Sequence, residues 1–357
     1  MMKKSSLLAA AAVGGAAALL LSGCAGGGTA TPDDGGDASN RACVILPDAA
    51  SSPRWENLDR PFLQDGLEAA GFEVDIQNSQ ADVNKFTTIA DQQLTQGCNI
   101  MLLVDYQGAA EAVAAKAKAE GIPVIAYDRP FSGADAYVSF DNVEVGRLQG
   151  QIVLDGLEAK GVAPADAVVV YIGGDPTDGN AGMFHEGADE VLSAAGISPA
   201  AEPDGAWDQT KSQTNFEQAL TALNGHVDGV WAANDTNAAG VIKVLQDNDL
   251  KGVAVSGQDA NVAGLQNILL GWQTGTVWKP VKDLAEKAVE VATTLVNGDE
   301  VQADAQLDDG TPYIQATPIS VGPDQVKDVI AAGGYATFDE VCTADVAAAC
   351  AEFGVTK

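Results

Sequence analysis

Residues 168–187 read VVVYIGGDPTDGNAGMFHEG, an apolar run that gives way to a polar, glycine-rich loop and then to a helix expected from about Asn180. The loop has neither the GxxxxGK[ST] nor the GxGxxG spacing, and it contains no lysine or arginine. A phosphate site at a helix start usually includes such a cation, and Asp175 and Asp178 would repel a phosphate. Two carboxylates at this point favour an uncharged ligand rich in hydroxyl donors.

The same order of strand, loop and helix repeats along the chain from residue 41. The apolar runs are continuous, which is typical of parallel strands covered on both faces. Gly71, Gly97 and Gly121 stand where helices are expected to end. The remaining length exceeds what one core usually holds. We therefore predict an α/β protein with two doubly wound parallel-sheet lobes.

Polar residues follow the predicted strands at their carboxyl ends. They are Asp128-Arg129, Asp175, Asn234-Asp235 and Gln258-Asp259. Doubly wound sheets bind ligands at this edge. We expect these side chains to face one cleft between the lobes.

The first residues predict export. Lys3 and Lys4 precede a short apolar stretch that ends in LSGC at 21–24, and this ending resembles the bacterial lipobox. We predict a lipoprotein signal peptide over 1–24, with Cys24 as the lipidated residue, and a flexible linker over 25–40. The protein would be anchored to the outer face of the cytoplasmic membrane. An ordinary signal peptide with an incidental cysteine is the alternative.

Four cysteines remain for the exported protein, an even number in an oxidising compartment. We expect the pairs Cys43–Cys98 and Cys342–Cys350, although four cysteines allow three pairings. No metal site is expected, because the two histidines lie far from any cysteine in sequence. The chain has 50 acidic and 19 basic residues and a net charge of −31, which argues against nucleic acid as a partner and against a polybasic membrane patch.

Six motifs point to a known family. They are AYDRP at 126–130, SFDN at 139–142, GGDPTDGNA at 173–181, AAND at 232–235, SGQDA at 256–260 and TVWKP at 276–280. In this order and spacing they resemble the periplasmic sugar-binding proteins of ABC importers, above all the D-xylose-binding group and its multiple-sugar relatives. The resemblance runs from about Cys43 to Val341.

The resemblance implies the type I periplasmic binding protein fold, with lobes joined by a three-segment hinge. The crossings would fall near 140–142, 277–280 and 316–319. The N-terminal lobe would then comprise 41–141 plus about 280–316, and the C-terminal lobe 142–279 plus about 317–357. Lobes joined in this way close around a ligand by a hinge motion.

The resemblance also implies the residues that hold the sugar. Trp55 and Trp207 would stack on opposite faces of the ring, with core packing as the alternative for Trp55. The polar contacts would come from Arg54, Asp128, Arg129, Asn180, Asn234, Asp259 and Lys279. Ion pairing is the alternative for the charged residues, and helix capping for the two asparagines. Asn142 and Asp178 would support the site.

One position departs from the family pattern. The D-xylose-binding group has an arginine where this sequence has His185. Arginine is a charged planar donor, whereas neutral histidine has one donor and one acceptor. His185 either contacts the ligand or lies at the surface beside a site with one contact fewer. This departure affects the identity of the sugar more than sugar binding itself.

We therefore predict a monomeric extracytoplasmic solute-binding protein without a cofactor. It would capture a monosaccharide, D-xylose or a related aldose, and deliver it to an ABC permease. A sugar sensor for a membrane receptor is an alternative. A glycoside-acting enzyme would have Asp128, Asp178 and Asp259 to use, but Arg129 should keep Asp128 ionised, which is unfavourable for a general acid. A transcriptional regulator would need a DNA-binding segment in place of the predicted signal and linker.

Overall fold

The computed structural model describes residues 40–49, 52–333 and 336–357. The predicted signal peptide, the lipidated Cys24 and the linker up to residue 39 lie outside the described residues. Within the described ranges, no helix is long and apolar enough to cross a membrane. The disulfides Cys43–Cys98 and Cys342–Cys350 are both present, so the predicted pairing is confirmed.

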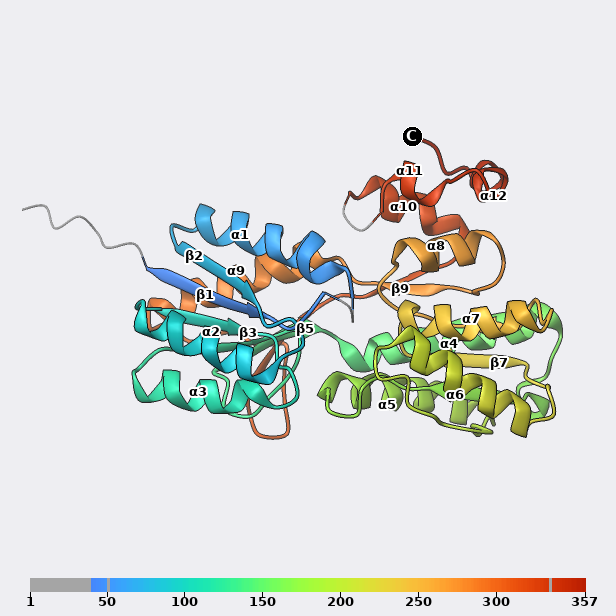
Figure 1. The fold of residues 1–357 in the computed structure, drawn as a ribbon, viewed down its shortest axis with the longest axis horizontal. Coiled ribbons are helices and arrows are strands. Elements are labelled where there is room, and N and C mark those ends of the chain that lie inside the picture. The colour runs from blue at the N-terminus through green and yellow to red at the C-terminus, as the bar shows by residue number, and fades with distance from the viewer. Residues whose placement is uncertain (1–39, 50–51, 334–335) are drawn as a thin grey trace, which may run out of the picture. The chain divides into compact units, whose positions relative to one another are not determined.

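The first lobe is built on a seven-stranded sheet with the order β10-β11-β5-β4-β3-β1-β2 (Figure 1). Its strands are β1 (Arg41–Leu46), β2 (Glu73–Asn78), β3 (Ile100–Leu103), β4 (Val124–Tyr127), β5 (Ala136–Phe140), β10 (Ala305–Gln306) and β11 (Pro312–Ala316). All pairings are parallel except that of β10 with β11. The carboxyl ends of the parallel strands therefore meet at one edge.

Helices cover both faces of this sheet, which explains the continuous apolar runs. The helices α1 (Arg60–Ala69) and α9 (Val281–Val296) lie on one face, with α2 (Val83–Thr95) and α3 (Ala109–Ala119) on the other (Figure 1). Val44 packs in the cluster that includes Leu63 and Leu284, whereas the next residue, Ile45, packs in the cluster that includes Phe86 and Val113. This alternation along β1 places both sides of the strand in the core.

The second lobe has a three-stranded parallel sheet of β6 (Val169–Ile172), β7 (Gly229–Ala232) and β8 (Ala254–Val255). Single bridges extend it on both sides. Ala201 and Asp204 bridge to the β6 edge, and Gln258 bridges to Val277. Val277 belongs to β9 (Thr276–Trp278), which pairs antiparallel with β12 (Ile319–Val321).

Five longer helices belong to this second sheet: α4 (Asn142–Lys160), α5 (Gly179–Ala194), α6 (Gln209–Ala222), α7 (Asp235–Asp247) and α8 (Val262–Leu269). Residues of α4 and α5 pack with Tyr171, and residues of α6 and α7 pack with its neighbour Ile172. The short α10 (Val326–Ala331), α11 (Phe338–Val341) and α12 (Ala347–Glu352) share a further cluster with α8 (Figure 1).

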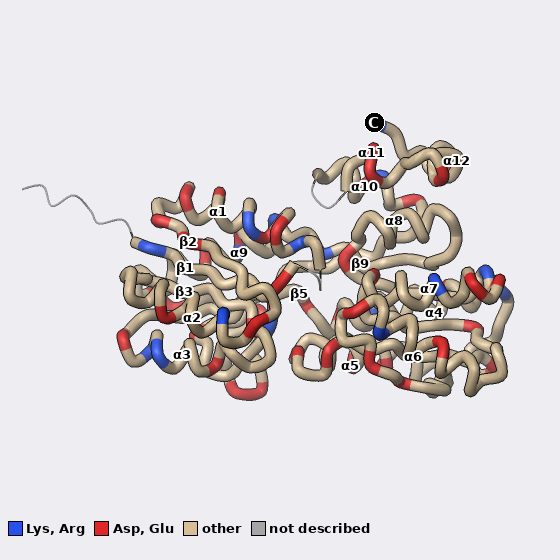
Figure 2. The backbone as a smooth tube through the Cα atoms, viewed as in Figure 1, with Lys and Arg blue, Asp and Glu red and all other residues tan. Residues whose placement is uncertain are grey.

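Within the described residues the chain passes between the lobes at three points. These are 140–142 between β5 and α4, 278–281 between β9 and α9, and 316–319 between β11 and β12. Each passage is only a few residues long, as expected of a hinge between two rigid bodies. Figure 2 shows acidic positions spread over the elements of both lobes, with lysine and arginine positions scattered among them.

Glycines allow α4 and α5 to approach each other closely. A Cβ atom at Gly187 would lie 1.9 Å from the carbonyl oxygen of Val143, and one at Gly146 would lie 2.1 Å from that of Phe184. Both obstacles are backbone atoms, which cannot rotate away as a side-chain end can. The contact between the two helices therefore depends on these missing side chains.

We predict that Gly187→Ala lowers the free energy of unfolding by about 1–3 kcal/mol, because the helices must move apart. Gly182→Ala on the same helix is the matched control, since nothing lies within 4 Å of its added Cβ. The control should leave stability unchanged or raise it by up to about 1 kcal/mol. Urea unfolding followed by circular dichroism measures both variants, and equal effects would contradict the close-packing argument.

Candidate ligand-binding cleft

The carboxyl ends of both sheets face a common cleft. One part of it, which we call the inner pocket, is lined by Ser52, Arg54, Trp55, Asp128, Arg129, Asp178, Asn180, Phe184, Trp207, Asn234, Gln258, Asp259 and Lys279. All the residues predicted to contact the ligand belong to this set except His185. The expectation that polar strand ends from both lobes converge therefore agrees with the geometry.

A π-helix, η1 (Trp55–Asp59), starts directly after Arg54 and positions its side chain. Residues five apart line up in a π-helix, and such turns are frequent at functional sites. Arg54 donates from Nε and Nη2 to the two carboxylate oxygens of Asp59, at 2.8 and 2.7 Å. Tyr127 Oη donates to the same carboxylate at 2.8 Å. Asp59 therefore fixes the orientation of the Arg54 guanidinium.

Sequence reasoning missed Asp59 and Tyr127. Asp59 follows Trp55 by four residues, and residues at this spacing lie on the same face of a helix as the apolar Trp55. A carboxylate on a buried face indicates a buried partner. That position was the available signal, and Arg54 was the obvious candidate for the partner.

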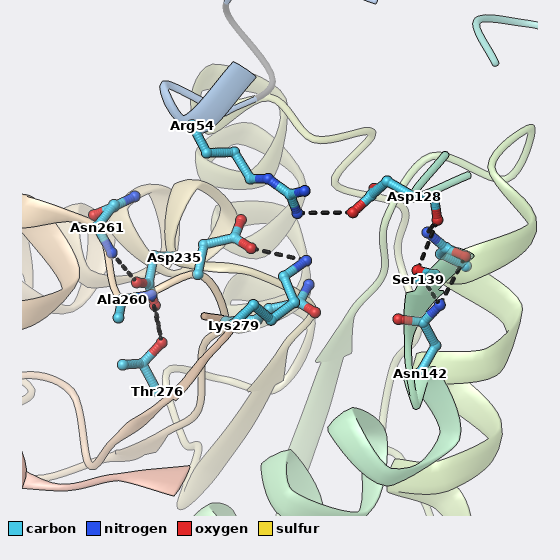
Figure 3. A network of polar contacts seen from close by, with 12 residues as sticks. Arg54, Asp128, Ser139, Asn142, Asp235, Ala260, Asn261, Thr276 and Lys279 are labelled. Atoms are coloured by element: carbon cyan, nitrogen blue, oxygen red, sulfur yellow. Dashed lines mark hydrogen bonds and ion pairs between the residues drawn. The ribbon is translucent and has the colours of Figure 1, made fainter. Parts of the chain in front are cut away.

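Arg54 also reaches Asp128, with 2.8 Å between Nη1 and Oδ2 (Figure 3). Asp128 directly follows β4 and has a φ of +64°, a left-handed conformation that turns its carboxylate into the cleft. Burial alone would raise the pKa of this carboxyl, but Arg54, Lys279 and Arg129 together bring it below its usual value. Asp128 is therefore ionised and accepts hydrogen bonds.

Arg129 connects the lobes. Its Nε lies 3.0 Å from Asp178 Oδ2 in the second lobe, and its Nη1 donates to the Asp105 carbonyl oxygen at 3.2 Å in the first. Trp207 Nε1 donates to the same Asp178 oxygen at 3.2 Å. Burial raises the pKa of Asp178, and the Arg129 charge offsets only part of this rise. Asp178 therefore contacts both Arg129 and Trp207.

The two tryptophans are held in different ways. Trp207 has a φ of +53°, and its indole lies directly over Gly174, where a Cβ atom would be 2.2 Å from the ring. Trp55 is buried in the core of the first lobe, and the Arg54 guanidinium carbon lies 4.4 Å from its ring centroid. Trp55 therefore has the core contacts of the alternative hypothesis and also lines the inner pocket.

The two asparagines also differ in the contacts that hold their side chains. The side chain of Asn234 caps α7, because it accepts a hydrogen bond from Asn237 N. Asn234 therefore makes the capping contact named as its alternative, and it also lines the pocket. Asp178, not Asn180, caps α5. Asn180 Nδ2 donates to the Asp128 carbonyl oxygen at 2.8 Å, and Oδ1 accepts from Tyr137 and Asn142. Asn180 thus joins the lobes directly, with Asn142 behind it.

Lys279 follows β9 at the second passage between the lobes. Its Nζ lies 3.0 Å from Asp259 Oδ1, and both side chains are more than nine-tenths buried. The amine also lies 5.7 and 5.8 Å from the ring centroids of Phe140 and Phe184. Asp259, like Asp128, has a positive φ, of +94°. Lys279 therefore places a positive charge at the hinge side of the pocket.

His185 is not among the residues that line the inner pocket. Its side chain is 43% exposed, and its Nε2 lies 2.9 Å from Glu202. The ring contacts the edges of Tyr171 and Trp231. Phe184, one residue earlier, lines the pocket, and a step of one residue turns a helical side chain by about 100°. In this structure His185 has the surface position that was one of its two predicted alternatives, and its contact with a ligand stays untested.

Three lining residues were predicted neither as contacts nor as supporting residues: Ser52, Phe184 and Gln258. Gln258 follows β8 and was expected only to face the cleft. Within the described residues, Ser52 Oγ and Gln258 Oε1 are buried without a hydrogen-bond partner. Buried polar atoms are rarely left unpaired. Two such atoms at the inner pocket are consistent with a polar ligand that pairs with them.

A second polar network supports the floor of the site (Figure 3). Asp235 Oδ1 accepts from Gln273 and Thr276, both at 2.8 Å, and Oδ2 accepts from Asn261 N at 2.9 Å. These bonds tie the starts of α7, α8 and β9 together. Burial, and next the charge of Asp259, raise the pKa of Asp235 to about 7, against the opposing effect of these hydrogen bonds. In the ranges that the structure covers, no group of His, Cys, Asp and Glu is arranged to hold a metal ion.

Comparison with known proteins identifies the family. Residues 43–300 match the model described as the periplasmic binding protein domain. The chain belongs to the periplasmic binding protein family. It has the type I fold of that family, as predicted from the motifs.

Several periplasmic binding proteins are similar over most of the chain. The D-xylose-binding periplasmic protein of Escherichia coli (strain K12) is 35% identical over 294 residues, covering 79% of this chain and 87% of that protein. The multiple sugar-binding periplasmic receptor ChvE of Rhizobium radiobacter is 29% identical over 331 residues, covering 84% and 91%. A solved ABC transporter solute binding protein from Clostridium phytofermentans, with bound β-D-glucose, superposes with a TM-score of 0.75 at 26% identity, covering 85% and 100%.

We predict that Asp235 makes stability fall as pH rises. Its folded pKa of about 7 lies above the ordinary 3.8, so between about pH 4 and 7 the folded state holds a proton that the unfolded state has lost. The contribution is therefore fully present below about pH 4 and is lost as pH approaches 7. Asp235→Asn, which does not titrate, should remove this slope in urea unfolding measured from pH 4 to 8. If the free energy of unfolding of wild type and of Asp235→Asn changes with pH in the same way, the raised pKa does not belong to Asp235.

Proposed function

We propose that this chain binds an uncharged monosaccharide, D-xylose or a related aldose, in the inner pocket and delivers it to an ABC permease. The charge balance of the pocket carries the proposal. Its lining contains three cations (Arg54, Arg129, Lys279) and three carboxylates (Asp128, Asp178, Asp259). Each cation lies within 3.0 Å of a carboxylate. A ligand with a net charge would disturb this balance in a buried site, whereas a neutral ligand would not.

The side chains that line the pocket are of the kinds that bind a sugar. The CH faces of a pyranose pack on aromatic rings, and Trp55, Trp207 and Phe184 provide such rings. Sugar hydroxyls both donate and accept, and they pair with planar guanidinium, carboxylate and amide groups. Because these groups come from both lobes, a bound sugar would stabilise the lobes in contact with each other.

The relatives support the same conclusion and favour binding over catalysis. The Escherichia coli relative is named for D-xylose, the Rhizobium radiobacter relative for multiple sugars, and the Clostridium phytofermentans structure contains β-D-glucose. The ionised state of Asp128 also disfavours a glycosidase, which needs a protonated acid. The position of His185 outside the pocket means that its difference from the D-xylose-binding group acts on the sugar only indirectly.

We further propose that the protein works as an exported monomer. The LSGC sequence at 21–24 supports lipidation at Cys24, and the small, polar residues of 25–40 support a flexible tether to the outer face of the cytoplasmic membrane. The two disulfides are consistent with an oxidising compartment. A tether of this kind would hold the two lobes near the permease.

Monosaccharide binding is the direct test. A saturating aldose should stabilise the purified protein by roughly 3–4 kcal/mol at a hundred to a thousand times its Kd. Arg129→Ala should lower the affinity about 100-fold or more, because it removes a buried charged donor and leaves the Asp178 carboxylate without a cation. Isothermal titration calorimetry with D-xylose, D-glucose, L-arabinose, D-ribose and D-galactose measures the affinities, and urea unfolding with and without the saturating sugar measures the stabilisation.

Arg147→Ala is the matched control for this test. Arg147 lies on α4, is 41% exposed and pairs with Glu190 and Glu144 outside the pocket. Its replacement should leave sugar affinity unchanged. Wild-type protein that binds none of these sugars would overturn the proposed function, and equal affinities for wild type and Arg129→Ala would overturn the site.

A second prediction concerns the support of Trp207. Gly174→Ala should lower sugar affinity at least about tenfold, or 1.4 kcal/mol, because the added Cβ displaces the indole that it would meet at 2.2 Å. The neighbouring Gly173→Ala is the control, since its Cβ would meet only Asp204 Oδ1 at 3.9 Å. Calorimetric titration of both variants with the preferred sugar decides the matter. Similar losses in the two variants would refute a specific role for Trp207.

A further inference from the structure

A second, larger space adjoins the inner pocket. This outer pocket has a volume of about 210 Å³, compared with about 30 Å³ for the inner one. A buried water needs roughly 10–15 Å³ on this kind of measure, so the outer pocket has room for more than a dozen. Arg129, Asp178 and Trp207 line both pockets. The two spaces are therefore parts of one continuous cleft.

Both lobes contribute to the outer pocket. Tyr106 and Gln107 come from the loop after β3 in the first lobe, and Asp175 and Thr177 come from the loop after β6 in the second. The pKa of Tyr106 is raised, first by burial and then by the nearby charges of Asp48 and Asp175. An aromatic ring, an amide, a hydroxyl and carboxylates thus surround this space, and these are the groups that hold a sugar.

The carboxylates of the outer pocket exclude an anionic group and favour hydroxyl donors. Two of them are already occupied at helix starts: Asp105 accepts from Gly108 N and Ala110 N, and Asp208 accepts from Lys211 N. The positive ends of the helices α3 and α6 compensate part of their charge. This arrangement accommodates a neutral, hydroxyl-rich group without requiring a cation.

We propose that the cleft accepts a neutral disaccharide, with one sugar unit in the inner pocket and the second in the outer pocket beside Tyr106. This inference rests on the proposed sugar-binding function and extends it from one sugar unit to two. Trp207 would contact both units, because its side chain lines both spaces. A monosaccharide would be held by the inner-pocket residues and would leave the Tyr106 side of the outer pocket empty.

The test compares monosaccharides with disaccharides on the purified full-length protein. Calorimetric titrations use D-xylose and D-glucose, and the disaccharides xylobiose, cellobiose, maltose and gentiobiose, which differ in linkage or sugar unit. At least one disaccharide should bind about tenfold more tightly than its own monosaccharide, which corresponds to 1.4 kcal/mol. Tyr106→Ala should remove this difference and leave the monosaccharide affinity unchanged. The monosaccharide affinity of each variant also reports whether it is folded.

Thr177→Ala provides a second variant in case Tyr106→Ala fails to fold. Thr177 is exposed on the opposite lobe, so its replacement disturbs little of the core. It should reduce the affinity of the disaccharide and not that of the monosaccharide. Glycerol phosphate and D-glucosamine complete the panel as an anionic and a cationic probe.

The outcomes separate this inference from the proposed function. Monosaccharide binding with no gain for any disaccharide would overturn the two-unit site and leave the proposed function intact. A gain for D-glucosamine alone would also overturn it, in favour of a cationic ligand group. A loss of both sugar classes together in the folded Thr177→Ala variant would contradict a separate outer pocket. The absence of any sugar binding would overturn both proposals.

Discussion

The pairing of buried charges is the constraint on which the cleft depends. Arg54, Arg129 and Lys279 are all at least nine-tenths buried, and each has a carboxylate within 3.0 Å. A buried charge without a partner costs several kcal/mol. The backbone must therefore bring each cation and its carboxylates together, whatever local conformation this requires. The π-helix after Arg54 is one result, because it aligns Arg54 with Asp59 five residues later.

Left-handed backbone conformations are a second result of the same constraint. Asp128, Trp207 and Asp259 have φ values of +64°, +53° and +94°. Each such residue costs of the order of 1–3 kcal/mol and persists only where the surroundings determine it. Here the surroundings are ion pairs, the contact of Trp207 with Gly174, and the hinge at Lys279. These three residues line the inner pocket, and their conformations keep their polar groups oriented before a ligand arrives.

The sequence predicts the features that follow from the pattern of apolar residues and from the order of the elements along the chain. Continuous apolar runs indicate buried parallel strands, and the polar residues after them must then share one edge, which places Asp128, Asn234 and Asp259 together. It does not predict the contacts that depend on rotation about a helix. A turn of about 100° separates Phe184 in the pocket from His185 outside it. The role of Asp59 likewise depends on a π-helical turn that an ordinary helical pattern does not reveal.

The interlobe pair links the chemistry of the cleft to the contact between the lobes. Arg129 and Asp178 belong to different lobes, and both line the inner and the outer pocket. A ligand shifts the lobes toward contact only by the free energy that it gains in that state relative to the separated state. A neutral ligand adds hydrogen bonds to the Arg129–Asp178 ion pair and leaves its charges balanced. All of the free energy that it gains from these bonds therefore favours the state in which the lobes are in contact. An anionic ligand would compete with Asp178 for Arg129 and would weaken the bond that joins the lobes. Selection for an uncharged ligand and contact between the lobes therefore have the same electrostatic cause.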